Sequence, residues 1–220
     1  MYQLILADNN ISNNDIRINI LTIIEKEFME GNLDKLISNI IEKEKKDIVI
    51  KNYNIITQLT TTENQKKNQN KNISTINLGE CEIKLKLFYN ISSSIPLLII
   101  KIDKKGELTT KVDYKIYNIE TKEPLNLTIC GDTKIELNIP VNINKSILNQ
   151  YDLSSDFYND ICYSYITENN TFVTIEKRRN IYVSNNMSLC DSNCNFKGYN
   201  DTTKKGLCEC NIINKFFKWF

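Results

Sequence analysis

Histidine is absent from all 220 residues of the chain. Its absence excludes Ser-His-Asp and Cys-His catalysis, zinc sites with histidine ligands and pH switching by imidazole. Glycine is scarce too, at six residues, and no glycine-rich loop that could hold a phosphate is present. We therefore expect no catalytic residue and no cofactor, and the chain is predicted not to be an enzyme.

Arginine is scarce as well, since Arg17, Arg178 and Arg179 are the only ones among 28 basic residues. The net charge of +1 provides no general attraction to a polyanion. Arginine is also the residue that usually recognises phosphate through two parallel hydrogen bonds. Nucleic acid is therefore not an expected partner.

Long hydrophobic runs are also missing. The longest, Ile95–Ile100, is far shorter than the roughly 20 residues that cross a bilayer. Met1–Asn10 lacks the basic start and apolar core of a secretory signal. The abrupt ending Lys215–Phe220 (KFFKWF) favours a piece of a longer chain. We expect any membrane contact to come from a segment outside this chain.

Cysteine, in contrast, is dense near the end of the chain, where four of the seven cysteines follow the pattern C-x3-C-x13-C-x-C. As zinc ligands they have the right number but lack paired C-x2-C units. As disulfides they resemble the small loop-rich frameworks of secreted modules. Cys208 and Cys210 are too close to bridge each other comfortably, so Cys190 and Cys194 would each pair with one of them. Disulfides are favoured over zinc, and the odd number leaves one cysteine free or paired outside this chain.

The first part of the chain predicts a helical hairpin. Apolar residues have helical spacing in Ile16–Glu30 and again in Leu33–Glu44, and Gly31 and Asn32 form a tight turn between them. Helices of this length are marginal alone, so we expect their apolar stripes to pack on a core.

The next stretch mixes patterns. Asp47–Thr62 is rich in β-branched residues and predicts one strand, and the polar tract Glu63–Asn72 predicts a solvated loop. Gly79–Asn90 fits both a strand and a helix, and the helix is favoured because Glu80 and Lys84 have helical i, i+4 spacing.

From residue 96 the pattern is that of β-structure. Alternating apolar runs predict a four-stranded antiparallel meander over Pro96–Val141, with a hairpin turn at Gly131-Asp132. Cys130 is out of phase with the apolar residues of its run, Leu125–Ile129, so it would lie on the opposite face. Cys81 is the nearest upstream cysteine, and a Cys81–Cys130 disulfide is predicted.

Beyond the meander, Asn144–Tyr165 predicts a crossing segment with a short helix capped by Ser154 or Ser155, and Thr174–Tyr182 predicts another short helix. Asp156 and Asp160 have i, i+4 spacing, so a carboxylate pair of a hydrolase is a third, weaker functional hypothesis. A solvated helix face or a cap is favoured. Four tyrosines are predicted to pack against the disulfides, with a carbohydrate- or peptide-binding patch as the alternative: Tyr158, Tyr163, Tyr165 and Tyr182.

Acceptor sequons for N-glycosylation are more frequent than the composition alone predicts. If the chain is secreted, we expect some of them to carry a glycan. The eight candidates are Asn10, Asn72, Asn90, Asn126, Asn144, Asn169, Asn186 and Asn200.

Several stretches are distinctive as a set: Asn72–Glu82 (NISTINLGECE), Asn126–Cys130 (NLTIC), Lys134–Val141 (KIELNIPV), Ser155–Tyr163 (SDFYNDICY) and Ser188–Cys210. Together they resemble a family of large, uncharacterised surface proteins of ciliates and similar AT-rich protists, whose ectodomains end in an EGF-like cysteine cluster followed by a membrane anchor. The resemblance implies an extracellular, glycosylated, disulfide-bonded module and no assigned activity.

These observations predict an α+β fold with a helical hairpin, a sandwich-like β-meander core and a small disulfide-rich C-terminal module. The expected function is a non-catalytic cell-surface module that binds an unidentified protein or carbohydrate. The alternative is an intracellular interaction domain whose zinc is held by Cys190, Cys194, Cys208 and Cys210. The expected divisions are 1–46 for the hairpin, 47–186 for the α+β domain, 187–213 for the EGF-like tail and 214–220 for a truncated linker.

Overall fold

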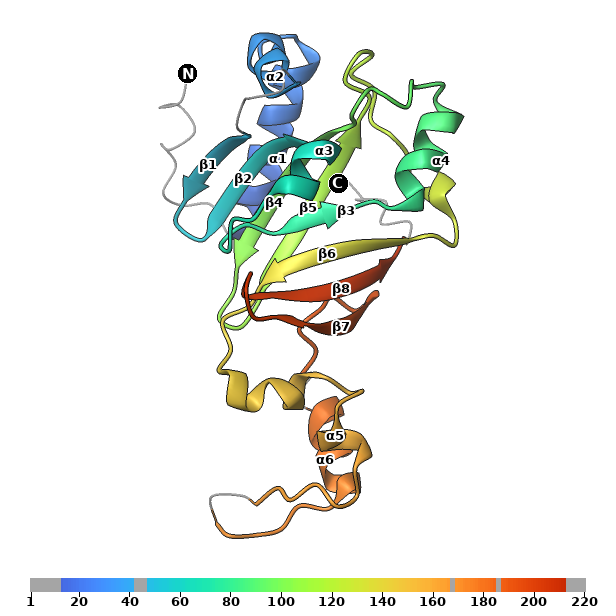
Figure 1. Ribbon diagram of the computed structural model, residues 1–220. Coiled ribbons are helices and arrows are strands. Elements are labelled where there is room, and N and C mark those ends of the chain that lie inside the picture. Colours follow the sequence, from blue (N-terminus) through green and yellow to red (C-terminus); the bar gives the residue numbers. More distant parts are fainter. Residues whose placement is uncertain (1–12, 42–46, 167–168, 185–186, 213–220) are drawn as a thin grey trace.

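The structure is a computed structural model that describes residues 13–41, 47–166, 169–184 and 187–212. Two four-stranded antiparallel sheets form its centre (Figure 1). Sheet A has the strand order β1-β2-β4-β5, and sheet B has the order β3-β6-β8-β7. Because helices accompany both sheets, the α+β class predicted from the sequence is confirmed.

The strands of sheet A are β1 (Ile48–Asn52), β2 (Ile55–Thr61), β4 (Leu98–Lys105) and β5 (Thr110–Tyr117). Those of sheet B are β3 (Thr75–Asn77), β6 (Lys134–Pro140), β7 (Cys194–Asn200) and β8 (Lys205–Asn211). The α-helices are α1 (Asn13–Met29), α2 (Asp34–Ile41), α3 (Thr62–Lys67), α4 (Glu80–Phe88), α5 (Asp156–Asn159) and α6 (Ile175–Ser184). Two 3-10 helices are η2 (Leu127–Cys130) and η3 (Lys145–Tyr151).

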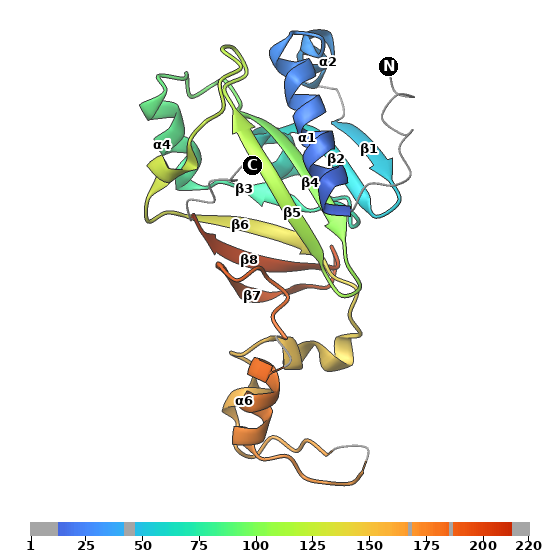
Figure 2. The same ribbon diagram turned by 180° about the vertical axis from the view of Figure 1, so that it is seen from behind.

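Helices α1 and α2 form the predicted hairpin and cover the outer face of sheet A (Figure 2). Gly31 ends α1 with a φ of +83°, a left-handed conformation that glycine adopts without steric cost. Phe28 packs edge-to-face on Tyr117 of β5, with ring centroids 5.3 Å apart. Ile24 and Ile37 join them in a buried cluster, which explains the apolar stripes in the sequence.

Strand β4 is buried on both faces because it lies between the helices and sheet B. Leu98 and Ile100 face the helices, while Ile99 faces the second cluster, which fills the space between the two sheets. The same inner face carries Lys101 and Asp103, both completely buried. A strand covered on both sides reads as an almost continuous apolar run, which is the pattern of Leu97–Ile100, before the charged residues begin.

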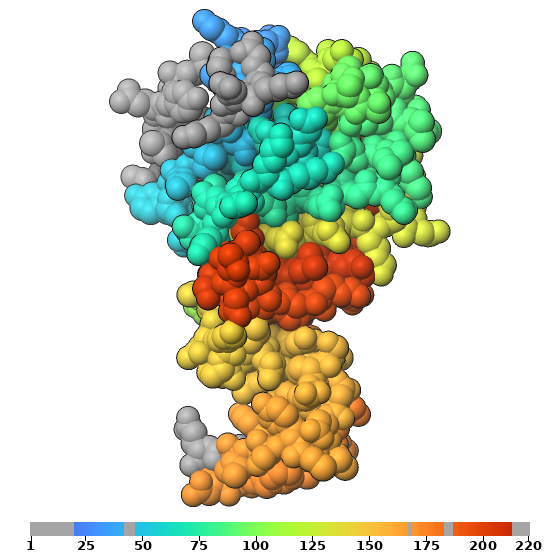
Figure 3. Space-filling view, in the orientation of Figure 1, coloured from blue at the N-terminus to red at the C-terminus, as the bar shows by residue number. Residues whose placement is uncertain are grey.

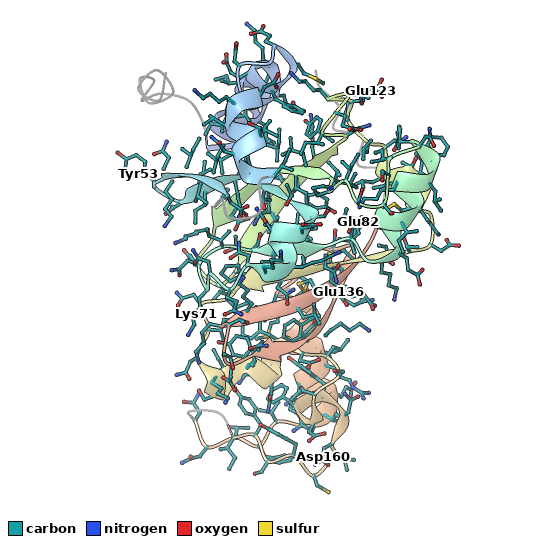
Figure 4. All side chains as sticks on the ribbon, turned by 45° about the horizontal axis from the view of Figure 1, so that its top comes forward. Tyr53, Lys71, Glu82, Glu123, Glu136 and Asp160 are labelled. Carbon is teal, nitrogen blue, oxygen red and sulfur yellow. A yellow bond between two sulfur atoms is a disulfide. The ribbon has the colours of Figure 1, made fainter. Side chains whose placement is uncertain are left out.

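The stretch Asp47–Thr62 contains two strands, β1 and β2, rather than the single strand predicted. They meet at Tyr53, whose φ is +45° and whose side chain projects fully exposed from the hairpin tip (Figure 4). The tract Glu63–Asn72 is not only a loop, because it includes most of helix α3. The side chain of Thr61 accepts a hydrogen bond from the Asn64 backbone N–H at 3.2 Å and caps this helix.

The predicted meander over Pro96–Val141 is wrong in its topology. Only β4 and β5 pair with each other, whereas β6 belongs to sheet B. The run Leu125–Ile129 is not a strand, because the Asn126 side chain accepts a hydrogen bond from the Thr128 N–H at 3.0 Å and caps η2. Gly131-Asp132 therefore connects a 3-10 helix to β6 and does not form a hairpin turn.

The cysteine-rich segment is an integral part of sheet B rather than an appended tail. Strand β8 lies between β6 and β7 and pairs with both along its length. Figure 1 shows these strands together below sheet A. Strand β8 contributes Cys208 and Cys210 to the inter-sheet cluster, so the core of the domain depends on this late part of the chain.

Between β6 and β7 the chain forms a helical appendage, residues 145–184, which includes η3, α5 and α6. It stands off from the sheets as a separate lobe (Figure 3). The predicted short helices are present as α5 and α6, and Ser155 occupies the N-cap position of α5. No helix in the described part of the chain is long and apolar enough to cross a membrane.

Candidate functional site

Three disulfides crosslink the structure. Cys190 pairs with Cys208 and Cys194 pairs with Cys210, which selects one of the two connectivities that the sequence leaves open for this cluster. Cys194 and Cys210 are direct partners across the β7–β8 ladder, with Cα atoms 3.9 Å apart. Cys208 and Cys210 share one face of β8 because they are two residues apart, and both are buried. Each bridge therefore fixes the edge strand β7 or its lead-in to β8.

The third disulfide is the predicted Cys81–Cys130 bridge. It joins the first turn of α4 to the end of η2, and both cysteines are completely buried. The Lys84 ammonium group donates a hydrogen bond to the Cys130 carbonyl at 3.1 Å, which adds a second tie between the same two elements. The pairing is as predicted, but Cys130 reaches Cys81 from a 3-10 helix and not from the far face of a strand.

The zinc alternative is wrong, because Cys190, Cys194, Cys208 and Cys210 are all oxidised and have no thiolate to bind a metal. No group of three or more possible metal ligands occurs within the described residues. The remaining cysteine, Cys162, is an exposed free thiol in the appendage.

An open cleft of about 370 Å³ lies where the two sheets diverge, between β5 on one side and the Cys194–Cys210 region on the other. Its polar lining residues include Glu25, Asp113, Asp191, Asn126, Asn193 and Asn211. Its apolar lining residues include Val112, Ile116, Leu125, Leu127, Leu137 and Ile212.

The electrostatics of the cleft are set by groups on α1 and β5. The Glu25 carboxylate accepts hydrogen bonds from the Lys115 ammonium group at 2.6 Å and from the Tyr117 hydroxyl. Burial, reinforced by the Glu25 carboxylate, raises the pKa of Tyr117. Burial alone raises the pKa of Tyr114 to about 12, so both phenols are neutral at physiological pH. Of the two phenols only Tyr114 lines the cleft, so the lining supplies apolar surface and one neutral hydroxyl.

The six candidate glycosylation sites that the structure describes all have exposed asparagines: Asn72, Asn90, Asn126, Asn144, Asn169 and Asn200. Asn10 and Asn186 lie outside the described residues. Three of the six use the side-chain oxygen Oδ1 to accept a backbone N–H two residues ahead, at 2.9–3.1 Å: Asn126, Asn144 and Asn200. Only Asn126 also lines the cleft.

The carboxylate-pair hypothesis receives no support from the geometry of the appendage. The Asp160 carboxylate accepts a hydrogen bond from the Cys162 N–H at 2.8 Å, and the Asp160 backbone N–H bonds to the Asp156 carbonyl at 2.9 Å. Asp160 thus acts as a loop cap, and Figure 4 places it at the far end of the molecule from Glu82 and Glu136.

The tyrosines before the cysteine cluster do not pack against the disulfides as predicted. Tyr158, Tyr163 and Tyr165 surround Phe157 edge-to-face, with ring centroids 4.7, 5.6 and 4.9 Å from it. Tyr182 stacks on Tyr158 in the same way at 5.2 Å. The rings thus form the core of the appendage, because the disulfides belong to the separate inter-sheet cluster.

A buried polar cluster between the sheets was not predicted. The Lys101 ammonium group donates to the Ser74 carbonyl at 2.5 Å and lies 3.3 Å from the Asp103 carboxylate. That carboxylate accepts the Ser74 N–H and hydroxyl, both at 2.6 Å. The available signal was that Lys101 and Asp103 alternate with apolar residues and share the strand face of Ile99. The cluster fixes β4 to the segment before β3.

The outer face of α4 is the other notable surface. Ile83, Leu87 and Phe88 are 61%, 77% and 66% exposed on a helix pinned by the Cys81 disulfide. On the inner side, Glu82 joins α4 to α3 (Figure 4), bonding the Thr62 hydroxyl at 2.8 Å and the Lys66 ammonium group at 3.1 Å. Burial alone would raise the pKa of Glu82. The bonds from Thr62 and Lys66, together with the ion pair with Lys86, outweigh it and lower the pKa below its usual value.

Comparisons with known proteins add no relatives. No family model matches the chain, and neither the curated proteins nor the solved structures contain a match. The site is therefore defined by this chain's own geometry: three disulfides, an open cleft and exposed sequons.

Proposed function

We propose that this chain is a non-catalytic module of an extracellular, membrane-anchored protein, with a structural, adhesive or receptor role. The observation that carries the proposal is the set of three disulfides, two of which hold sheet B together. Disulfides persist in oxidising compartments and are rare in a reducing cytosol. The anchor would be a segment outside this chain, and the relatives would be the protist surface proteins that the sequence resembles.

The glycosylation candidates support the same compartment. N-linked glycans are added to sequons of secreted chains and need exposed asparagines. All six described candidates meet this requirement. The partner is a protein or a carbohydrate, since neither the charge nor the scarcity of arginine favours nucleic acid.

Secretion of the chain from a eukaryotic host behind a supplied signal peptide tests the proposal. Alkylation of the unreduced protein should add one label, at Cys162, and alkylation after reduction and unfolding should add seven. Intact mass should also fall after enzymatic removal of N-glycans. A secreted protein with seven reactive thiols and no glycan would refute the proposal.

A further inference from the structure

One glycan acceptor is built into the wall of the cleft. Asn126 is exposed, lines the cleft and is held at two points. Its Oδ1 accepts the Thr128 N–H at 3.0 Å, and its own backbone N–H donates to the Tyr89 hydroxyl at 3.0 Å. Neither bond uses Nδ2, the nitrogen that N-glycosylation modifies. The side chain is thus oriented while the acceptor atom is left available.

The cleft has the chemistry that a sugar requires. Its volume of about 370 Å³ lies within the range of small-ligand sites, about 300–1,000 Å³. The apolar walls, such as Leu125 and Leu137, suit the C–H faces and the acetyl methyl group of an N-acetylhexosamine. Among the polar lining residues, Asn193, Asn211 and Asp191 can exchange hydrogen bonds with its hydroxyl and amide groups.

We propose that the cleft is occupied by the first sugars of the chain's own N-linked glycan on Asn126. In the transfer, Nδ2 bonds to the anomeric carbon of a diphosphate-linked oligosaccharide donor, the carbon–oxygen bond to diphosphate breaks, and one amide proton is released. Because the sugar is then tethered at the wall, its local concentration is high and weak contacts suffice to seat it. The inference rests on the proposed function, since the transfer requires the secretory route.

Asn144 provides a matched control. Its Oδ1 accepts the Ser146 N–H at 3.1 Å and caps η3, just as Asn126 caps η2. It is also exposed, but it does not line the cleft. Asn126→Gln and Asn144→Gln each remove one sequon and one cap. Because only Asn126 lines the cleft, only the first variant should uncover it.

The test uses the rate at which a water-soluble phosphine reduces each disulfide in the secreted protein, followed by alkylation and mass spectrometry. The Cys194–Cys210 bridge lines the cleft, whereas Cys190–Cys208 does not and serves as an internal reference that is independent of η2, the helix capped by Asn126. We expect Asn126→Gln and Thr128→Ala to accelerate reduction of Cys194–Cys210 several-fold. Asn144→Gln and Thr128→Ser, which keeps the sequon, should leave the rate unchanged.

Two results would overturn the inference while leaving the proposed function intact. One is a secreted protein that carries glycans at other sites but none at Asn126. The other is an equal change of the Cys194–Cys210 reduction rate in the Asn126→Gln and Asn144→Gln variants. A protein with no glycan and seven free thiols would instead remove the proposed function, so the two failures are distinguishable.

Discussion

Lys205 is a lysine at an almost completely buried position. Its side chain is only 2% exposed in β8, near Lys101 and Asp103 of β4. Burial first, and then repulsion by Lys101, lower the pKa of its ammonium group from 10.5 to about 8, against the attraction of Asp103. The folded protein thus holds this proton less tightly than the unfolded chain does.

The stability of the protein should therefore depend on pH through Lys205. Between pH 8 and 10.5 the unfolded chain binds more protons at this residue, so its contribution to the free energy of unfolding rises with pH. Urea unfolding at pH 7.5 and 9.5 measures the effect, in a Cys162→Ser background that avoids thiol exchange. The Lys205→Met variant should lose this increase in the free energy of unfolding between the two pH values. The Lys111→Met variant, at an exposed lysine, should keep it. Equal pH dependence of both variants would contradict the expectation.

The residue scale also shows where prediction from the sequence succeeds. Spacing argues against a Cys208–Cys210 bridge and so pairs Cys190 and Cys194 with these two cysteines, but it does not decide which pairs with which. The Cys81–Cys130 pairing is as predicted, although Cys130 lies in a 3-10 helix and not in the strand assumed for it. The polar cluster of Lys101 with Asp103 is different. Its members are joined to Ser74 across the two sheets, and no local pattern encodes such a distant partner.

At the scale of elements, the disulfides should contribute unequally to stability. Cys194–Cys210 closes a loop of 16 residues and Cys81–Cys130 one of 49. Chain entropy gives about 3 kcal/mol for the shorter loop and about 4 kcal/mol for the longer one. The double serine variants, compared by urea unfolding, should show this order. A larger loss from the shorter bridge would indicate that packing of β7, and not loop closure, dominates.

Helices and strands were predicted correctly where a local sequence pattern determines them. The prediction failed where a side-chain cap or pairing with a distant strand determines the structure. The helices α1, α2 and α4 followed from 3.6-residue spacing and a stop at Gly31. The alternation in Leu125–Ile129 equally fits a strand, but the Asn126 cap selects a 3-10 helix. Strand β8 could not be placed beside β6 from the sequence, because more than sixty residues, including the appendage, separate the two strands.

At the scale of the whole molecule, the appendage depends on one buried cation. Arg178 is completely buried and donates to the Tyr163 carbonyl at 2.5 Å and the Asp160 carbonyl at 2.8 Å. The guanidinium group lies 5.5 Å from the Phe157 ring centroid, and Nε has no partner within the described structure. This one side chain therefore connects α6 to the loop after α5.

Arg178→Met should unfold the appendage while the sheets stay folded. Hydrogen bonds to a charged group contribute about 1.5–3 kcal/mol each, so amides of residues 156–165 should exchange roughly tenfold faster or more. Hydrogen-exchange mass spectrometry compares these amides with those of β4, which should not change. Lys177→Met, at the exposed neighbouring position, is the control. Faster exchange in β4 as well would show that the two lobes unfold together.

The central place of β8 in sheet B has a consequence for the order of events during synthesis. Sheet A is complete once β5 has emerged, but β6 has no neighbour on its β8 side until the appendage and β7 have been made. At about 5–20 residues per second, that interval is on the order of ten seconds. The Asn126 side is open during this time, since Cys210 and Ile212 of the opposite wall do not yet exist. If Asn126 carries the proposed glycan and receives it in that interval, the last strand would insert after the sugar is attached and would enclose it, so the order of synthesis would help to place the sugar in the cleft.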